Sequence, residues 1–122
     1  MSVFKKKAKS LPPMPAWEEI VAHMQGESLS GYADTVVRVI SSRDLSKRIL
    51  VLKSENGYFK TVYEEICVCD EELWICICND PDACPAWWQP VNSSINRGSF
   101  YGSEEEAVRE VEMSREYATF FV

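Results

Sequence analysis

Four cysteines form the most distinctive chemical grouping in the sequence. They occur as two alternating pairs, Cys67-Val-Cys69 and Cys76-Ile-Cys78. Alternate side chains of an extended chain share a face, so two neighbouring strands carrying these pairs would bring the four thiols onto one patch. Zinc needs its sulfur ligands roughly 4 Å apart, whereas alternate strand residues lie about 6.6 Å apart at Cα. The spacing therefore favours packing as small apolar side chains, with a zinc-binding or redox module as the alternative.

Acidic side chains flank the second cysteine pair. None of them follows the D-x-D-x-D-G spacing of a calcium loop. We interpret them as a partner-binding surface that steers a basic protein by complementary charge. The residues concerned are Asp70, Glu71, Glu72, Asp80 and Asp82.

Two adjacent tryptophans, Trp87 and Trp88, complete this predicted surface. Neighbouring side chains of an extended chain point to opposite faces. The alternatives are that both are buried, or that one packs on the core while the other is exposed. An exposed tryptophan is the kind of residue that dominates the energetics of an interface.

Evidence for catalysis is weak. His23 is the only histidine, and Cys84 lies far from it in sequence with no obvious third group to orient the pair. The phosphate-binding glycine loops, the nucleophile elbow and the H-E-x-x-H zinc motif are all absent. We therefore predict a protein that is not an enzyme and that has no cofactor and no resident metal.

Two helices are predicted, one near each end of the chain. Residues 15–26 begin with a proline, have acids in the first turn, and place Trp17, Ile20, Val21 and Met24 on one face. A capping box of Ser103 with Glu106 starts the second helix. After a restart at residue 114, the aromatic tail is expected to pack onto the body.

Between the helices the composition favours strands, predicted at residues 32–41, 48–53, 58–69 and 73–78. The second is apolar on both faces and should be central. Asn56-Gly57 predicts a type I′ hairpin turn. Residues 84–91 have prolines near both ends, which favours an edge strand or an ordered loop.

These elements predict an α+β fold. We expect an antiparallel meander of four to five strands, with the N-terminal and C-terminal helices packed on one face, the face that carries Ile66 and Val68. The opposite face, with the cysteines and Trp74, would then be a second packing layer, a docking surface or the seam of a symmetric homodimer.

Length and charge bound the class of protein. The 122 residues suffice for one domain, predicted at 15–122 after a flexible basic, proline-rich leader at 1–14. There is no apolar run long enough to span a membrane and no secretory signal, so we expect a cytoplasmic protein without membrane contact.

Residues 62–122 carry thirteen acids against three arginines, a net charge of −10. That charge disfavours nucleic-acid binding by the folded part.

The layout resembles the small immunity proteins that bacteria encode beside polymorphic or contact-dependent toxins. The resemblance covers about half the chain, through Lys47-Arg-Ile-Leu-Val-Leu-Lys53, Pro85-Ala-Trp-Trp-Gln-Pro90 and Tyr101-Gly-Ser-Glu-Glu-Glu106. It implies a non-catalytic cytoplasmic inhibitor that binds and occludes one toxin domain, often a basic nuclease.

Overall fold

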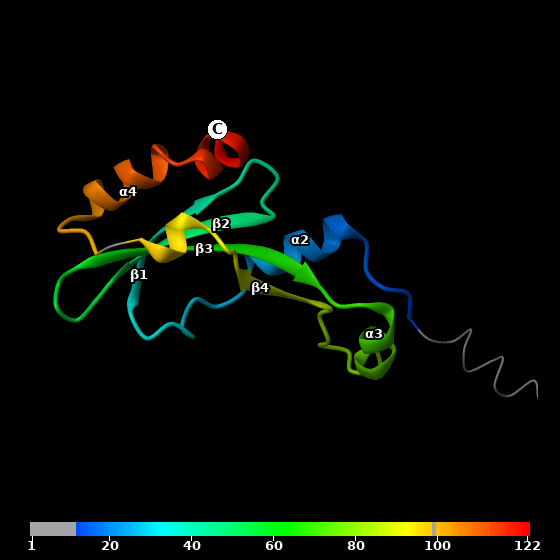
Figure 1. Cartoon of the computed structure of the whole chain (residues 1–122). Helices are drawn as coiled ribbons and strands as arrows, with labels where there is room; N and C mark the ends of the chain where they lie inside the picture. The colour runs from blue at the N-terminus through cyan, green and yellow to red at the C-terminus, as the bar shows by residue number, and fades with distance from the viewer. Residues whose placement is uncertain (1–11, 99) are drawn as a thin grey trace, which may run out of the picture.

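The computed structural model describes residues 12–98 and 100–122, so most of the predicted leader lies outside the described residues. Four strands form one open antiparallel sheet in the order β1-β2-β3-β4 (Figure 1). They are β1 (Thr35–Ser41), β2 (Lys47–Lys53), β3 (Phe59–Val68) and β4 (Ala86–Pro90). The predicted α+β fold with an antiparallel meander is confirmed. Within the described ranges, no helix is both long enough and apolar enough to cross a membrane.

In the part of the chain that the structure describes, three α-helices and two shorter helical segments accompany this sheet. They are α2 (Trp17–Gln25), α3 (Glu71–Ile77), α4 (Glu104–Glu112), the 3-10 helix η1 (Ser94–Arg97) and the π-helical η2 (Tyr117–Phe121). In α2, Ile20, Val21 and Met24 are buried as the periodicity predicts, but Trp17 is exposed.

Strand β2 is an inner strand of the sheet. Residues 49–52 of this strand are almost completely buried, because β2 pairs with β1 on one side and β3 on the other. The β2–β3 hairpin turns at Asn56-Gly57, as predicted, but its turn is not type I′. Of Asn56 and Gly57, only Gly57 has a positive φ, of 84°, and its N–H donates to the carbonyl of Ser54 at 3.0 Å. Glycine is needed at that single position because side chains with a Cβ rarely adopt this conformation.

The two terminal helices cover opposite faces of the sheet, rather than one face. Helix α2 packs against Ile66 of β3, whereas Val111 of α4 belongs to a core with Ile49 and Tyr63. Tyr63 and Ile66 are an odd number of residues apart in β3, so they point to opposite sides. Both faces of the central strands are apolar, and each therefore needs its own cover.

A buried polar network lies on the α2 face. The Nε of Arg48 donates to Oε1 of Glu64 at 2.9 Å, and the hydroxyl of Tyr32 donates to the same carboxylate at 2.6 Å. The Arg48 guanidinium carbon also lies 4.0 Å from the centroid of the Trp88 ring. These contacts fasten the segment that follows α2 to the sheet. Burial and the neighbouring Glu64 carboxylate raise the pKa of Tyr32.

The predicted strand at residues 73–78 is wrong, because these residues belong to helix α3 and the turn that follows it. Asp70 caps the helix: its side chain accepts a hydrogen bond from the N–H of Leu73 at 2.8 Å. Glu71 and Glu72 then stand in the first turn, where acids complement the helix dipole.

The fourth strand is instead β4. It occupies the sheet edge, which is one of the two alternatives predicted from its flanking prolines.

The C-terminal elements follow their local signals. The hydroxyl of Ser103 accepts a hydrogen bond from the N–H of Glu106 at 3.1 Å and starts α4, as the capping box predicted. In the tail, the ring of Phe121 packs against Tyr63 with 5.9 Å between centroids. Phe120 remains partly exposed over the side chain of Lys47.

Candidate functional site

Residues 69–85 form an excursion between β3 and β4 that extends beyond one end of the sheet, and we call it the α3 excursion (Figure 1). Its small core consists of Cys69, Trp74 and Cys78, with Met14 packed against it. The indole N–H of Trp74 donates to the carbonyl of Pro12 at 3.0 Å. The segment preceding α2 is thus fastened to the excursion rather than to the sheet.

All five acids predicted for partner binding lie in the α3 excursion, and they divide into two kinds. Asp70 caps α3, and the Asp80 side chain accepts from the N–H of Asp82 at 2.9 Å, so both shape the local backbone. Glu71, Glu72 and Asp82 are exposed, and none forms an ion pair with another described residue. These three carboxylates are available to a partner.

The charge around α3 has no compensation within its own stretch of sequence. Between Lys60 and Arg97 the chain contains no lysine or arginine at all, but it contains seven acids. In α4, Glu104 pairs with Arg38 at 2.7 Å, Glu106 accepts from the N–H of Gly102, and Arg109 belongs to the same helix. Unlike α4, the α3 excursion consequently has no basic residue of its own.

The structure separates the two tryptophans. Trp88 points to the α2 face, where its indole N–H donates to the carbonyl of Met24 at 3.1 Å. Trp87 pairs across the sheet with Cys67 and is 44 % exposed on the other face. Of the two, only Trp87 can serve as an exposed anchor next to the α3 excursion.

The predicted cysteine patch does not exist, because the second pair lies on a helix instead of a strand. Cys76 is exposed on α3, while Cys78 is buried in the small core of the excursion. The same change removes the sheet face that was expected as a second packing layer, docking surface or dimer seam: Trp74 is buried.

The thiols do not favour metal or redox chemistry at this place. Among the described residues, no three side chains of His, Cys, Asp or Glu are grouped so that they could hold a metal ion. Burial, with a smaller contribution from Glu65, raises the pKa of Cys67, and burial with Asp70 raises that of Cys69. A raised pKa lowers the fraction of the reactive thiolate. The four-thiol patch that the zinc or redox alternative required is therefore not formed, although Cys69 and Cys78 lie together in the small core of the excursion.

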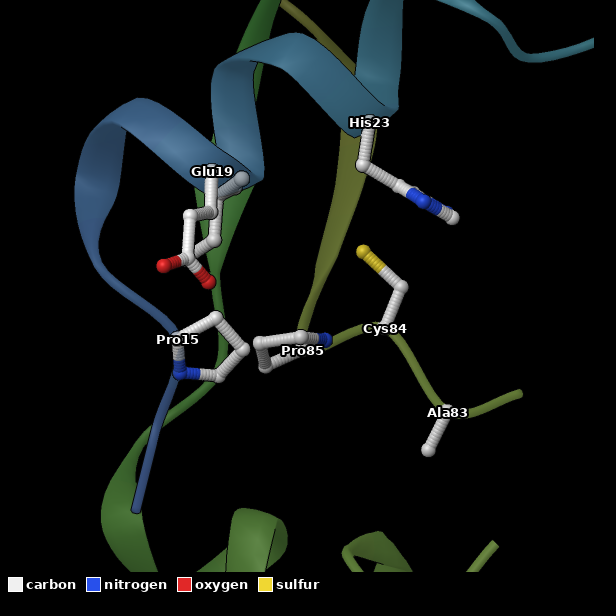
Figure 2. A pocket seen from close by; sticks show the side chains of 7 residues that line it. Pro15, Glu19, His23, Ala83, Cys84 and Pro85 are labelled. Carbon is white, nitrogen blue, oxygen red and sulfur yellow. The ribbon is translucent and has the colours of Figure 1, made fainter. Parts of the chain in front are cut away.

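A pocket of about 170 Å³ lies between α2 and the chain that enters β4 (Figure 2). Its wall includes Glu19 and His23 from α2 and Cys84 from the segment before β4. Figure 2 shows the sulfur of Cys84 directed toward the helix near His23, whereas the Glu19 carboxylate lies beside Pro15. The distance between Cys84 and His23 in the sequence argued against pairing them, and only the packing of α2 against β4 brings their segments together. The helical spacing of Glu19 and His23 places both on one face of α2, but no local signal brings Cys84 to them.

Comparison of the chain with protein-family models, with curated proteins and with solved structures gives no match.

Proposed function

We propose that this chain is a non-catalytic binding protein, an immunity protein that neutralises a cognate bacterial toxin domain. In this proposal the α3 excursion contacts a basic surface of the toxin. The observation that carries it is the concentration, on one projecting element, of carboxylates that form no ion pair with another described residue. Glu71, Glu72 and Asp82 are exposed there, in a stretch of sequence that has no basic residue.

Charge complementarity of this kind acts mainly on association. A local negative field raises the rate at which a basic partner collides in the productive orientation, and salt screens that field. The α3 excursion suits this role because its carboxylates are not needed by the sheet.

Trp87 supplies the apolar contribution. An indole that is 44 % exposed can transfer a large apolar area from water into an interface, which slows dissociation. Cytoplasmic localisation belongs to the same proposal.

The first experiment tests neutralisation itself. The probe is the C-terminal domain of a large secreted protein encoded directly upstream, expressed with and without this chain. Growth arrest by that domain and full growth on co-expression support the proposal. Arrest that co-expression leaves unchanged, or an upstream frame that encodes a metabolic enzyme, contradicts it.

A second experiment tests the surface, with the toxin domain as the titrant. Glu71→Gln with Glu72→Gln should lower the association rate roughly three- to tenfold at low salt. The matched control, Glu110→Gln with Glu112→Gln, removes the same charge from α4 at the other end of the molecule. Equal effects of the two pairs would show that only net charge matters and would reject the α3 excursion as the contact.

A further inference from the structure

A second candidate site lies in the pocket between α2 and β4 and does not involve the α3 excursion. The Sγ of Cys84 lies 3.9 Å from the Sδ of Met24. Met24 is completely buried in α2, while Cys84 is half-buried in the pocket wall. A thiol in the pocket wall thus contacts a thioether that lies behind this wall, in the core under α2.

The separation of the two sulfurs fits a shared soft ion. Two sulfurs that each lie about 2.3 Å from an ion, in trigonal geometry, are about 4 Å apart. Thiolate and thioether are the ligands that select monovalent copper over harder ions. The two side chains would therefore need little movement to bind one ion between them.

His23 can supply the third donor. It lines the same pocket as Cys84, and Figure 2 places it above the sulfur. Its side chain is exposed and hydrogen-bonds to no other described residue, so the imidazole is free to rotate toward the two sulfurs. Ile20, Pro85 and Ala83 add apolar surface to the wall, which limits the access of competing water, while the Glu19 carboxylate lies beside Pro15 (Figure 2).

We propose that this pocket binds one Cu⁺ ion through the thiolate of Cys84, the thioether of Met24 and the imidazole of His23. Binding forms three metal–ligand bonds and releases one proton, that of the Cys84 thiol, to solvent. The oxidation state of copper does not change. Thiolate and ion together are neutral, which suits the partly buried position.

The test is a titration of the full chain with Cu⁺, under reducing and oxygen-free conditions, against a colorimetric Cu⁺ chelator. We expect one ion per chain. Cys84→Ser should abolish binding, and Met24→Leu and His23→Gln should each weaken it by about tenfold or more. Met24→Leu conserves side-chain volume, and its melting curve shows whether the fold is retained.

Cys76→Ser is the matched control, because it removes an exposed thiol outside the pocket. It should leave copper affinity unchanged. An independent readout is the NMR signal of the Met24 methyl group, which should shift on addition of Cu⁺ and stay in place in Cys84→Ser. Equal affinity of Cys84→Ser and the unmodified chain would overturn the proposal. Equal affinity of Met24→Leu and the unmodified chain would do the same, since it would reduce the site to a single thiol.

Discussion

The four-stranded sheet with the helices that cover it, which we call the body, and the α3 excursion are held together in different ways. In the body, β2 pairs on both sides, four of its residues are almost completely buried, and helices cover both faces. In the α3 excursion, a helix of seven residues rests on a core of three buried side chains. The body has a large shared core, whereas the excursion depends on a few local contacts.

This difference separates stability from recognition. Side chains in the body contribute to one cooperative structure, so a change there should affect the whole molecule. The excursion can change its exposed residues without disturbing β2 or β3, as surface connections on rigid scaffolds generally do. Its exposed carboxylates are therefore open to selection for a partner.

The largest effect should come from the buried ion pair of the body. The side chains of Arg48 and Glu64 are only 9 % and 6 % exposed. Arg48→Met leaves the Glu64 carboxylate buried with the Tyr32 hydroxyl as its remaining partner, and should lower the free energy of unfolding by about 3–5 kcal/mol. Urea unfolding measures the change.

The matched control for that change is Arg38→Met. Arg38 also pairs with a glutamate, Glu104, but its side chain is 47 % exposed. Removing an exposed pair should cost about 0–1 kcal/mol. If both substitutions lower the free energy of unfolding by the same amount, the buried pair of Arg48 and Glu64 contributes no more stability than an exposed pair.

Trp74→Ala tests whether the α3 excursion unfolds independently. The change removes the largest side chain of the small core and its hydrogen bond to Pro12. A buried tryptophan is worth about 3 kcal/mol or more, which corresponds to roughly hundredfold faster hydrogen exchange when the effect is local. We expect that acceleration for amides of residues 71–78 and little change in β2 and β3.

Trp17→Ala, which truncates an exposed tryptophan of α2, is the control and should leave exchange in α3 unchanged. Uniform acceleration throughout the sheet in Trp74→Ala would mean that the excursion and the body form one cooperative unit.

A smaller effect should distinguish the two capped helices. Asp70 caps α3 and Ser103 caps α4, each through one side-chain hydrogen bond to the N–H three residues later. Alanine at either cap should cost about 1 kcal/mol. We expect Ser103→Ala to lower the urea midpoint of the body, because α4 contributes to its core, and Asp70→Ala to act only on exchange within α3. A shift of the urea midpoint by Asp70→Ala equal to that of Ser103→Ala would contradict the distinction.

The sequence was informative wherever one local signal had a single interpretation. The buried strand β2, the position of the turn at Asn56-Gly57 and the N-cap at Ser103 were predicted correctly, although the turn is not type I′ and the Glu106 carboxylate accepts from Gly102. Residues 73–78 failed because every residue is apolar, and a short run of that kind fits a strand or a helix equally well. The Asp-Glu-Glu that precedes this run is a helix-start signal, and it favours the helix over the strand. The pocket with Cys84 and His23 depends on tertiary packing, which no local signal reports.

The smallest predicted effect concerns pH and the β1–β2 connection of the body. Asp44 accepts from the N–H of Ser46 at 3.0 Å and from the Ser46 and Ser42 hydroxyls, and these bonds lower its pKa from 3.8 to about 2. A lowered pKa means that the folded state favours the carboxylate, so its contribution is complete above about pH 3.8 and is lost as pH falls toward 2. Asp44→Asn should therefore lower the urea midpoint slightly and by a constant amount from pH 7 to about pH 4, with the difference disappearing below that. The Asp44 carboxyl carbon signal in NMR gives the pKa directly, and a midpoint at or above 3.8 would show that the connection does not prefer the charged form.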